Sequence, residues 1–267
     1  MAGYDACNAK PLTSGEDAVP QKPHIRHLPK QIVEEDDRMP ANQPKPIIGA
    51  VTIGQAPRTD VTPDVLPLLG NSFELIQAGA LDSVTDFESI APEPGDYVLV
   101  SRLRDGRSVP MAERKIIPHV QQAIARLEEQ GASSIMMWCT GEFPMPLRAN
   151  VPVLYPSRLL SRTVSAIAPR RLAVVIPDAS QIEQTRAQWL HSVDDVCVYA
   201  ANPYDEHDSL AAALDRAADA ARELQADLAV LDCIGFSLEG KRRFRERSGI
   251  PTILPRTLLA RVVQELA

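Results

Sequence analysis

The chain of 267 residues lacks any apolar run approaching the roughly 18 residues that a membrane-spanning helix needs. Its first residues, Met1 to Leu12, also lack the hydrophobic core of a secretory signal. Positive charge is in deficit, because 28 Lys and Arg stand against 35 Asp and Glu for a formal net charge of -7. Such a surface would repel nucleic acid and anionic membranes, so we expect neither as a partner. We expect a cytoplasmic protein that binds a small molecule.

Cysteine is scarce as well, with four residues in the whole chain and no CxxC pair. This number and scatter argue against a disulfide framework and against the usual zinc or redox motifs. The pair His24 and His27 has no further ligand nearby, so the sequence predicts no metal site. The glycine patterns GxGxxG and GxxxxGK[ST] of nucleotide-binding loops are absent too. The cysteines are therefore predicted to be free thiols.

The first 46 residues differ in composition from the rest. They contain seven of the 23 prolines and a single aromatic residue, Tyr4, and show no amphipathic period. Such a segment cannot bury enough apolar surface to offset the entropy lost on ordering. We predict a disordered tail over 1–46, which includes Cys7.

From Ile47 onward, short apolar runs alternate with helical patterns, as is typical of parallel sheets covered by helices. The sequence predicts an α/β fold with helices over Ala112 to Gln130 and Ser209 to Leu224, the second capped by Asp208. Thr62-Pro63-Asp64 predicts a short helix with Asp60 as its cap, and Tyr97 to Leu103 predicts a hairpin. Strands are predicted over 47–53, 72–77, 134–138, 151–154, 172–176, 195–200, 228–232 and 251–254.

An internal repeat divides this region into two halves. VPVLYPSRLLSR at 151–162 and IPTILPRTLLAR at 250–261 share their Pro, Leu-Leu and Arg positions at a constant offset of 99. Upstream, ARLEEQGASSIMMWCTG at 125–141 parallels ARELQADLAVLDCIG at 221–235. Two βαβ units resemble one another in any case, but the shared Pro-x-x-x-Pro-x-x-Leu-Leu-x-x-Arg pattern favours duplication. We predict two pseudosymmetric, doubly wound parallel-sheet lobes, 47–165 and 166–267, with a cleft between them.

The repeat gives Cys139 and Cys233 equivalent positions, each after an apolar strand and two residues before a glycine. Carboxyl ends of parallel strands form the ligand crevice of open α/β sheets, so the two thiols are predicted to face one cleft. Backbone N–H groups near Gly141 and Gly235 would lower the thiol pKa and supply thiolate. The alternative is that both are buried core thiols, which is our interpretation of Cys197.

Four stretches carry a resemblance to a known family: TIGQAPRTDVTPDVLP at 52–67, YPSRLL at 155–160, ANP at 201–203 and LDCIGF at 231–236. They resemble the AroM protein family, which in turn is similar to the aspartate/glutamate racemase superfamily. The resemblance implies two lobes around an active site, no cofactor, and one cysteine from each lobe. It implies that one thiolate removes a Cα proton while the other thiol donates a proton to the opposite face. Cys139 and Cys233 take these catalytic roles.

Substrate contacts are predicted from residue type and position at the strand ends. Arg58 could hold a substrate carboxylate with two hydrogen bonds, although many loop arginines simply face water. Ser157-Arg158 and Arg256-Thr257 leave equivalent strands and could reach the cleft. Asp178, Ser180, Glu142 and Asp232 have either a site role or a strand-edge role. The predicted substrate-binding set is Thr52, Gly54, Gln55, Arg58, Thr140, Gly141, Ser157, Arg158, Ile234 and Gly235.

The leading hypothesis is a cofactor-independent racemase, epimerase or isomerase acting on a small carboxylate or amino acid through two cysteines. Two alternatives stay open: a single-thiol decarboxylase or maleate-type isomerase, and a carboxylate-binding protein without turnover. The last is motivated by Ile234, which replaces the threonine that often follows the second cysteine of the superfamily. Thr52-Ile53-Gly54-Gln55 likewise replaces the superfamily's Asp-Ser pair. The fold is compatible with a homodimer.

Overall fold

The computed structural model describes residues 44–143 and 147–266. The predicted tail therefore lies almost entirely outside the described residues, as do Cys7, His24 and His27. The first strand begins at Ile47, where the apolar pattern of the sequence begins.

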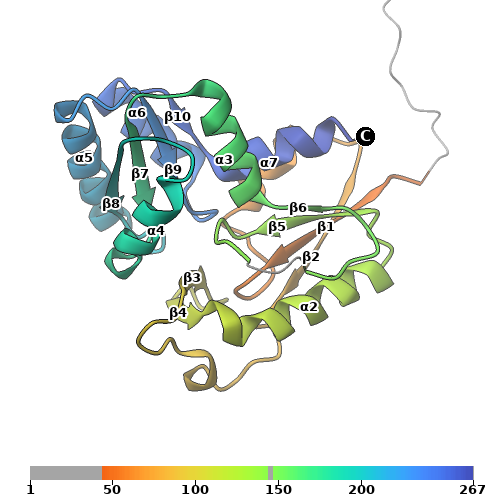
Figure 1. Ribbon diagram of the computed structural model, residues 1–267. Helices are drawn as coiled ribbons and strands as arrows, with labels where there is room; N and C mark the ends of the chain where they lie inside the picture. The colour runs from red at the N-terminus through yellow and green to blue at the C-terminus, as the bar shows by residue number, and fades with distance from the viewer. Residues whose placement is uncertain (1–43, 144–146, 267) are drawn as a thin grey trace, which may run out of the picture. The chain divides into compact units, whose positions relative to one another are not determined.

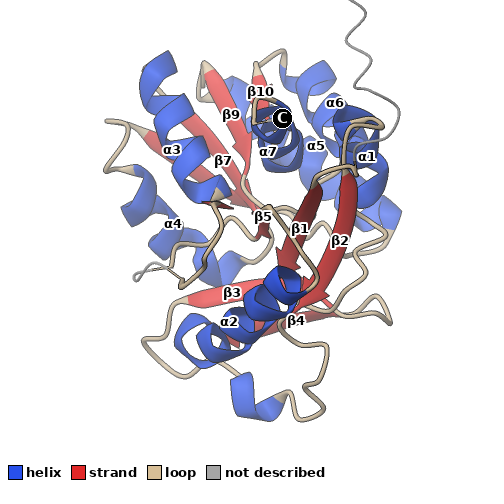
Figure 2. Ribbon diagram, turned by 90° about the vertical axis from the view of Figure 1, so that its right-hand side faces the viewer, coloured by secondary structure: helices blue, strands red, loops and turns tan. Residues whose placement is uncertain are grey.

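Two four-stranded parallel sheets form the framework (Figures 1 and 2). In each sheet the two central strands are the most apolar, which is typical of parallel sheets with both faces covered. The first sheet has the order β2-β1-β5-β6, with β1 (Ile47–Thr52), β2 (Glu74–Gly79), β5 (Ser134–Trp138) and β6 (Val153–Leu154). The second has the order β10-β9-β7-β8, with β7 (Leu172–Ile176), β8 (Val196–Ala200), β9 (Leu228–Leu231) and β10 (Thr252–Ile253).

Helices connect the strands and cover the faces of the sheets. The predicted α/β class with two lobes is confirmed, and the long helices form where the apolar spacing indicates. The α-helices are α1 (Thr62–Leu69), α2 (Glu113–Glu129), α3 (Pro156–Ile167), α4 (Ile182–Trp189), α5 (His207–Glu223), α6 (Leu238–Ser248) and α7 (Pro255–Gln264). Two short 3-10 helices are η1 (Glu88–Ile90) and η2 (Ala179–Gln181).

The strand orders show the internal repeat in three dimensions. Read from the opposite edge, the second sheet runs β8-β7-β9-β10, which matches β2-β1-β5-β6 strand for strand. β5 and β9 are therefore equivalent, and Cys139 and Cys233 each stand just beyond their ends.

The helix that follows the last strand of each half packs against the sheet of the other half. Leu160 and Val164 of α3 share a buried cluster with Leu172 and Val174 of β7. Leu259 of α7 shares another cluster with residues of β1 and β5. α3 and α7 also contact each other between the two sheets (Figure 1). The predicted boundary after residue 165 falls near the end of α3. The division of the chain at this residue stays a prediction.

An antiparallel hairpin, β3 (Val98–Arg102) and β4 (Ser108–Ala112), is inserted between β2 and α2. Gly106 takes a φ of 93° in its turn, a left-handed conformation that favours glycine. The hairpin prediction is thus confirmed, and the insertion belongs to the first half of the repeat. It adds a wall to the cleft, as described below.

Three local predictions are wrong. α5 begins at His207, and its cap residue Glu206 makes no side-chain capping bond, so Asp208 lies in the first turn and does not cap the helix. Asp60 does not cap α1, because its carboxylate binds Arg58. Cys197 is only half-buried, since β8 is an edge strand.

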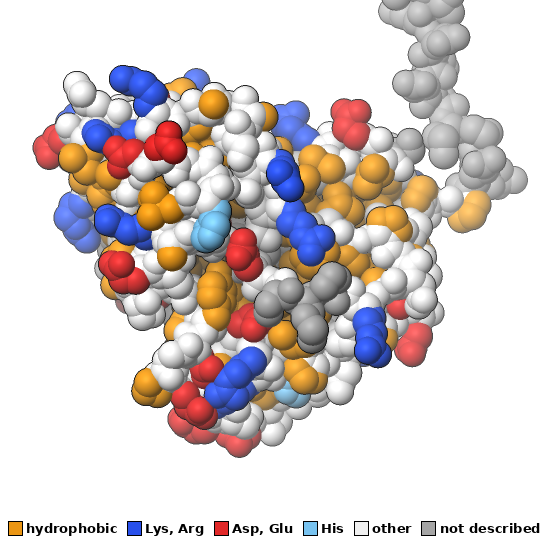
Figure 3. All heavy atoms as spheres, viewed as in Figure 1, with side chains coloured by type: hydrophobic (Ala, Val, Ile, Leu, Met, Phe, Trp, Pro, Cys, Tyr) orange, Lys and Arg blue, Asp and Glu red, His pale blue; other side chains and the backbone are white. Residues whose placement is uncertain are grey.

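The surface in Figure 3 intersperses acidic and basic side chains over the face that it shows. Lys and Arg lie close to Asp and Glu on this face, as the many ion pairs of the described residues also indicate. Within 44–143 and 147–266, no helix is both long and apolar enough to cross a membrane.

Arg256 ties α7 to the first half of the chain. Its guanidinium is fully buried and donates to the carbonyl of Ile234 at 2.9 and 2.6 Å, to the carbonyl of Asp60 at 2.8 Å and to Asp64 Oδ2 at 2.8 Å. From its position after a strand end, Arg256 could have reached the cleft. These bonds instead hold its guanidinium away from the cleft.

Replacing Arg256 with alanine should lower the free energy of unfolding by about 3 kcal/mol, because the buried carbonyl of Ile234 and the partly buried acceptors of Asp60 and Asp64 would lose their donor. Urea denaturation measures this loss. Arg261→Ala on the exposed side of α7 is the matched control and should change stability by less than about 0.5 kcal/mol. Equal losses for the two variants would contradict this account of Arg256.

Candidate active site

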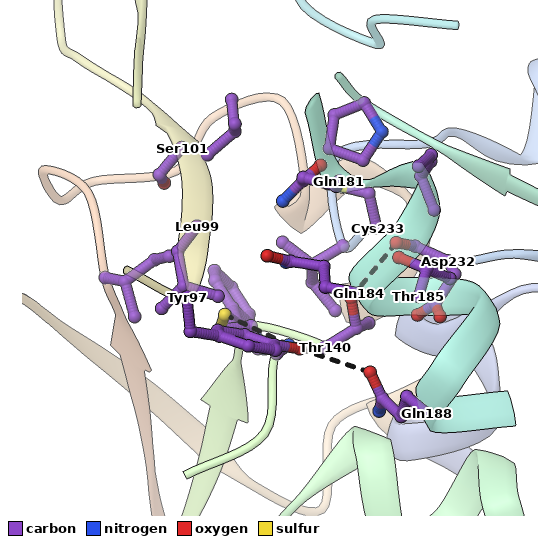
Figure 4. A pocket seen from close by; sticks show the side chains of 18 residues that line it. Tyr97, Leu99, Ser101, Thr140, Gln181, Gln184, Thr185, Gln188, Asp232 and Cys233 are labelled. Atoms are coloured by element: carbon purple, nitrogen blue, oxygen red, sulfur yellow. Dashed lines mark hydrogen bonds between the residues drawn. The ribbon is translucent and has the colours of Figure 1, made fainter. Parts of the chain in front are cut away.

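Cys139 and Cys233 line one cavity between the two sheets, at the carboxyl ends of β5 and β9 (Figure 4). Both thiols are buried, at 7% and 6% exposure. We call this space the inter-cysteine cavity. Its other described lining residues are Ile53, Tyr97, Leu99, Val100, Ser101, Trp138, Thr140, Gly141, Ile176, Pro177, Gln181, Gln184, Thr185, Gln188, Asp232 and Ile234.

The two cysteines have the same local geometry. The N–H of Gly141 donates to Cys139 Sγ at 3.3 Å, and the N–H of Gly235 donates to Cys233 Sγ at 3.4 Å. Both glycines are required by close packing: a Cβ would lie 2.2 Å from Leu99 Cδ2 at the first and 2.6 Å from the Tyr204 ring at the second. The repeated Cys-x-Gly spacing therefore gives each sulfur a backbone donor, which favours its thiolate form.

Burial nevertheless outweighs these donors. It raises the pKa of the Cys139 thiol to about 12, and it raises the pKa of the Cys233 thiol above its ordinary value as well. The expectation that the site lowers both thiol pKa values is therefore wrong. The sequence shows the donors, but the depth at which a strand end is buried depends on packing from the other half.

Cys233 has more support for its thiolate than Cys139. The Tyr204 hydroxyl lies 3.6 Å from Cys233 Sγ, and Arg58 Nη2 donates to the same hydroxyl oxygen at 3.3 Å. Since that oxygen accepts from Arg58, its proton is free to point toward the sulfur. The Gly235 N–H, the Tyr204 hydroxyl and the Arg58 charge all lower the pKa of Cys233, against the larger effect of burial.

Arg58 is engaged within the protein. Its Nε and Nη2 donate to Asp60 at 2.8 and 2.7 Å, and Nη1 donates to Thr52 Oγ1 at 3.1 Å. Its side chain is buried at 2% exposure, and it does not belong to the described lining of the inter-cysteine cavity. These bonds occupy the guanidinium within the protein, and the predicted contact of Arg58 with a substrate carboxylate stays a prediction.

The remaining predicted contacts divide into two groups. Thr140, Gly141 and Ile234 line the inter-cysteine cavity, whereas Thr52, Gly54, Gln55 and Gly235 are absent from its described lining. Gln55 instead bonds the backbone of Leu81 and Arg104, which fixes the loop after β1. Ser157 and Arg158 line neighbouring cavities, and the Arg158 guanidinium stacks over the Tyr155 ring at 4.4 Å.

The sequence left it open whether four residues have a role in the site or at a strand edge. Of these, Asp232 lines the inter-cysteine cavity, and Glu142 lines two neighbouring cavities. The Asp178 carboxylate accepts from the N–H and the hydroxyl of Ser180, so Asp178 caps η2, in which Ser180 lies. Burial raises the pKa of the Asp232 carboxyl to about 6, although Trp189 Nε1 donates to it at 2.8 Å.

Three glutamines of η2 and α4 complete the wall opposite the hairpin. Gln184 bonds Val98 twice, accepting from its N–H at 3.1 Å and donating to its carbonyl at 2.8 Å. Gln181 donates to the same carbonyl at 2.9 Å, and Gln188 accepts from the Tyr97 hydroxyl at 3.1 Å (Figure 4). Sequence reasoning missed these residues, although their i, i+3, i+7 spacing marks one face of a helix.

These bonds hold the cavity nearly closed. Its volume is about 40 Å³, which leaves room for no more than a few water molecules. Within the described residues, no cluster of three or more His, Cys, Asp or Glu side chains has the arrangement of a metal site.

The chain belongs to the AroM protein family, whose model matches residues 48–267. Three solved structures have a similar fold. A liganded mutant of arylmalonate decarboxylase has a TM-score of 0.57 at 16% identity, covering 83% of this chain and 92% of its own. Aspartate racemase from Picrophilus torridus has a TM-score of 0.56 at 11% sequence identity, and the match covers 83% of this chain and 94% of the racemase. Allantoin racemase from Klebsiella pneumoniae has a TM-score of 0.54 at 13% identity, and the match covers 83% of this chain and 87% of that racemase. No curated protein matches the chain.

Gln184→Ala should increase the rate at which iodoacetamide alkylates Cys139 and Cys233 by about 30-fold. Loss of two hydrogen bonds of roughly 1 kcal/mol each shifts the closed cavity toward open forms. Peptide mass spectrometry measures the rate at each cysteine. Cys197 on the edge strand serves as an internal control, and its rate should not change; a uniform rise at all three sites would point to general destabilisation instead.

Proposed function

We propose that this protein is a cofactor-independent racemase, epimerase or isomerase that moves a proton between the two faces of a carbon beside a carboxylate. One observation supports this proposal above all others: two cysteines from equivalent strand ends of a repeat line a single cavity, each with a glycine N–H on its sulfur. Packing alone does not require matched donors on two sulfurs. The racemases among the proteins of similar fold agree with this chemistry.

The unequal surroundings of the sulfurs assign their starting roles. Cys233, with the Tyr204 hydroxyl and Arg58 behind it, is the thiolate that removes the α-proton. The electron pair of the broken C–H bond passes into the substrate carboxylate. Cys139 is the thiol that gives its proton to the opposite face of the carbon. After one turnover Cys233 carries the proton and Cys139 the charge, and the reverse reaction restores the first state.

The same inequality supports a second candidate, a decarboxylase that uses one thiol. In that reaction carbon dioxide leaves the substrate, and a single thiol protonates the resulting carbanion. Ile234 after Cys233, in place of the hydroxyl of Thr140 after Cys139, makes the two halves of the site chemically different. Arylmalonate decarboxylase among the similar folds agrees with this alternative.

Incubation with amino and hydroxy acids in D₂O separates these candidates. Under the two-thiol mechanism, deuterium enters Cα, and Cys139→Ala and Cys233→Ala each lower racemisation at least about 100-fold, as expected for loss of a general acid or base. Cys197→Ala is the matched control and leaves the rate unchanged. If only one of the two variants loses activity, and carbon dioxide is released, the single-thiol reaction replaces our proposal. Full activity of both variants would contradict both candidates.

Tyr204→Phe should lower deuterium exchange several-fold at pH 8, because loss of its hydrogen bond raises the pKa of the Cys233 thiol. Since the thiolate is the reactive form, exchange by the variant rises with pH and approaches the wild-type rate in more alkaline solution. A pH–rate profile measures this shift. Tyr199→Phe on β8 is the control, and a loss that is independent of pH would indicate a structural role for Tyr204.

A further inference from the structure

The inter-cysteine cavity shares a wall with a larger space. Thr140, Gln188 and Asp232 line both, and the second, which we call the adjoining cavity, has a volume of about 220 Å³. The roughly 40 Å³ between the cysteines can hold little more than a reacting carbon and its attached atoms. If the proposed function is correct, the rest of the substrate extends past Asp232 into the adjoining cavity.

The charged groups of this space are acidic. Asp232 belongs to the shared wall, and Glu142 and the imidazole of His191 also line the adjoining cavity. Neither Lys nor Arg belongs to the described lining of the two cavities. A second carboxylate on the substrate would therefore lie beside carboxylates without a paired cation, which is unfavourable because like charges repel.

Two buried acceptors have no donor within the described residues, one in the wall that the two cavities share and one in the inter-cysteine cavity. Asp232 Oδ1 accepts no hydrogen bond, because the nearby Thr140 hydroxyl donates to the backbone carbonyl of Asp232 at 3.1 Å and Trp189 Nε1 donates to Oδ2. Gln181 Oε1 is also unpaired, and turning its amide would not help, because Nε2 must donate to the Val98 carbonyl. The two side chains are only 9% and 7% exposed. Unpaired buried acceptors are rare in proteins, and a ligand that brings hydrogen-bond donors would satisfy them.

We propose that Asp232 selects substrates whose distal part carries a hydrogen-bond-donating nitrogen, an amide or an ammonium, and that it disfavours dicarboxylates. Asp232 precedes Cys233 directly, so a group bound to Oδ1 has a fixed position relative to the reactive sulfur. Asp232 is thus a positioning and specificity residue that takes no proton from the reacting carbon. The proposed substrate thus has a single carboxylate group, next to the reacting carbon, and carries N–H groups at its other end.

Matched pairs of amino acids test this preference by their effect on thermal unfolding, which reports binding without turnover. Glutamine and ornithine should stabilise the protein at concentrations at least fivefold lower than glutamate, and asparagine should do so relative to aspartate. Stabilisation by ornithine with none by glutamine assigns the ammonium, and the reverse assigns the amide. Equal or stronger stabilisation by the dicarboxylates overturns the proposal, as does the absence of stabilisation by every amide and amine.

Asp232→Asn should reverse the preference. Its carbonyl oxygen would remain paired with Trp189 Nε1, so its NH₂ would replace the free acceptor with a donor. The variant should bind glutamine or ornithine at least fivefold more weakly than the wild type and glutamate more tightly. Asp194→Asn, at an exposed position outside the two cavities, is the matched control with wild-type ranking. An unchanged ranking in Asp232→Asn overturns the proposal.

Glu142→Gln offers a second variant that does not disturb the buried site, since Glu142 is exposed. It should weaken an ammonium ligand several-fold and leave an amide ligand unchanged.

Deuterium exchange and ligand preference can be tested separately. Cys139→Ala and Cys233→Ala should abolish deuterium exchange without altering the order in which the amino acids stabilise the protein. Preferred binding of amides or amines without exchange would keep the inference and reject the isomerase, whereas exchange into glutamate alone would do the opposite.

Discussion

Two buried guanidinium groups converge on Asp60, and the relation between the halves of the molecule depends on them. Arg58 holds the Asp60 carboxylate and reaches Tyr204 in the second half, while Arg256, from the second half, holds the Asp60 carbonyl and Asp64. Buried charges must be paired or fully hydrogen-bonded, so these contacts leave little freedom in how the halves meet. The position of Cys233 near Cys139 follows from this arrangement.

The cleft combines two opposing effects on its thiols. Backbone N–H groups at matched glycines favour thiolate, but closure of the hairpin against α4 removes water and favours the neutral thiol. A closed site that keeps its cysteines protonated protects them from oxidants, since the thiolate is the form that reacts.

The sequence predicted the fold and the cysteine pair well because both depend on local and repeated patterns. The strands 134–138 and 172–176 were predicted to the residue, and the repeat identified Cys139 and Cys233 as equivalent. Predictions failed where a long-range partner decides the outcome. A loop arginine looks available until Asp60, two residues on, and Tyr204 from the other half are seen to occupy it. The spacing of Gln181, Gln184 and Gln188 predicts one helix face. That this face binds the hairpin is evident only from the hydrogen bonds to Val98.

The repeated Pro-containing motif marks the two points at which the chain crosses from one sheet to the other. At Tyr155-Pro156 it leaves β6 for α3, which covers the second sheet, and at Leu254-Pro255 it leaves β10 for α7, which covers the first. A fragment that encoded either half alone would therefore expose an apolar sheet face and carry a helix with nothing to cover. Any rotation that widens the cleft must also change the contact between α3 and α7. The two halves of the repeat are thus mutually dependent parts, because each supplies the helix that covers the sheet of the other.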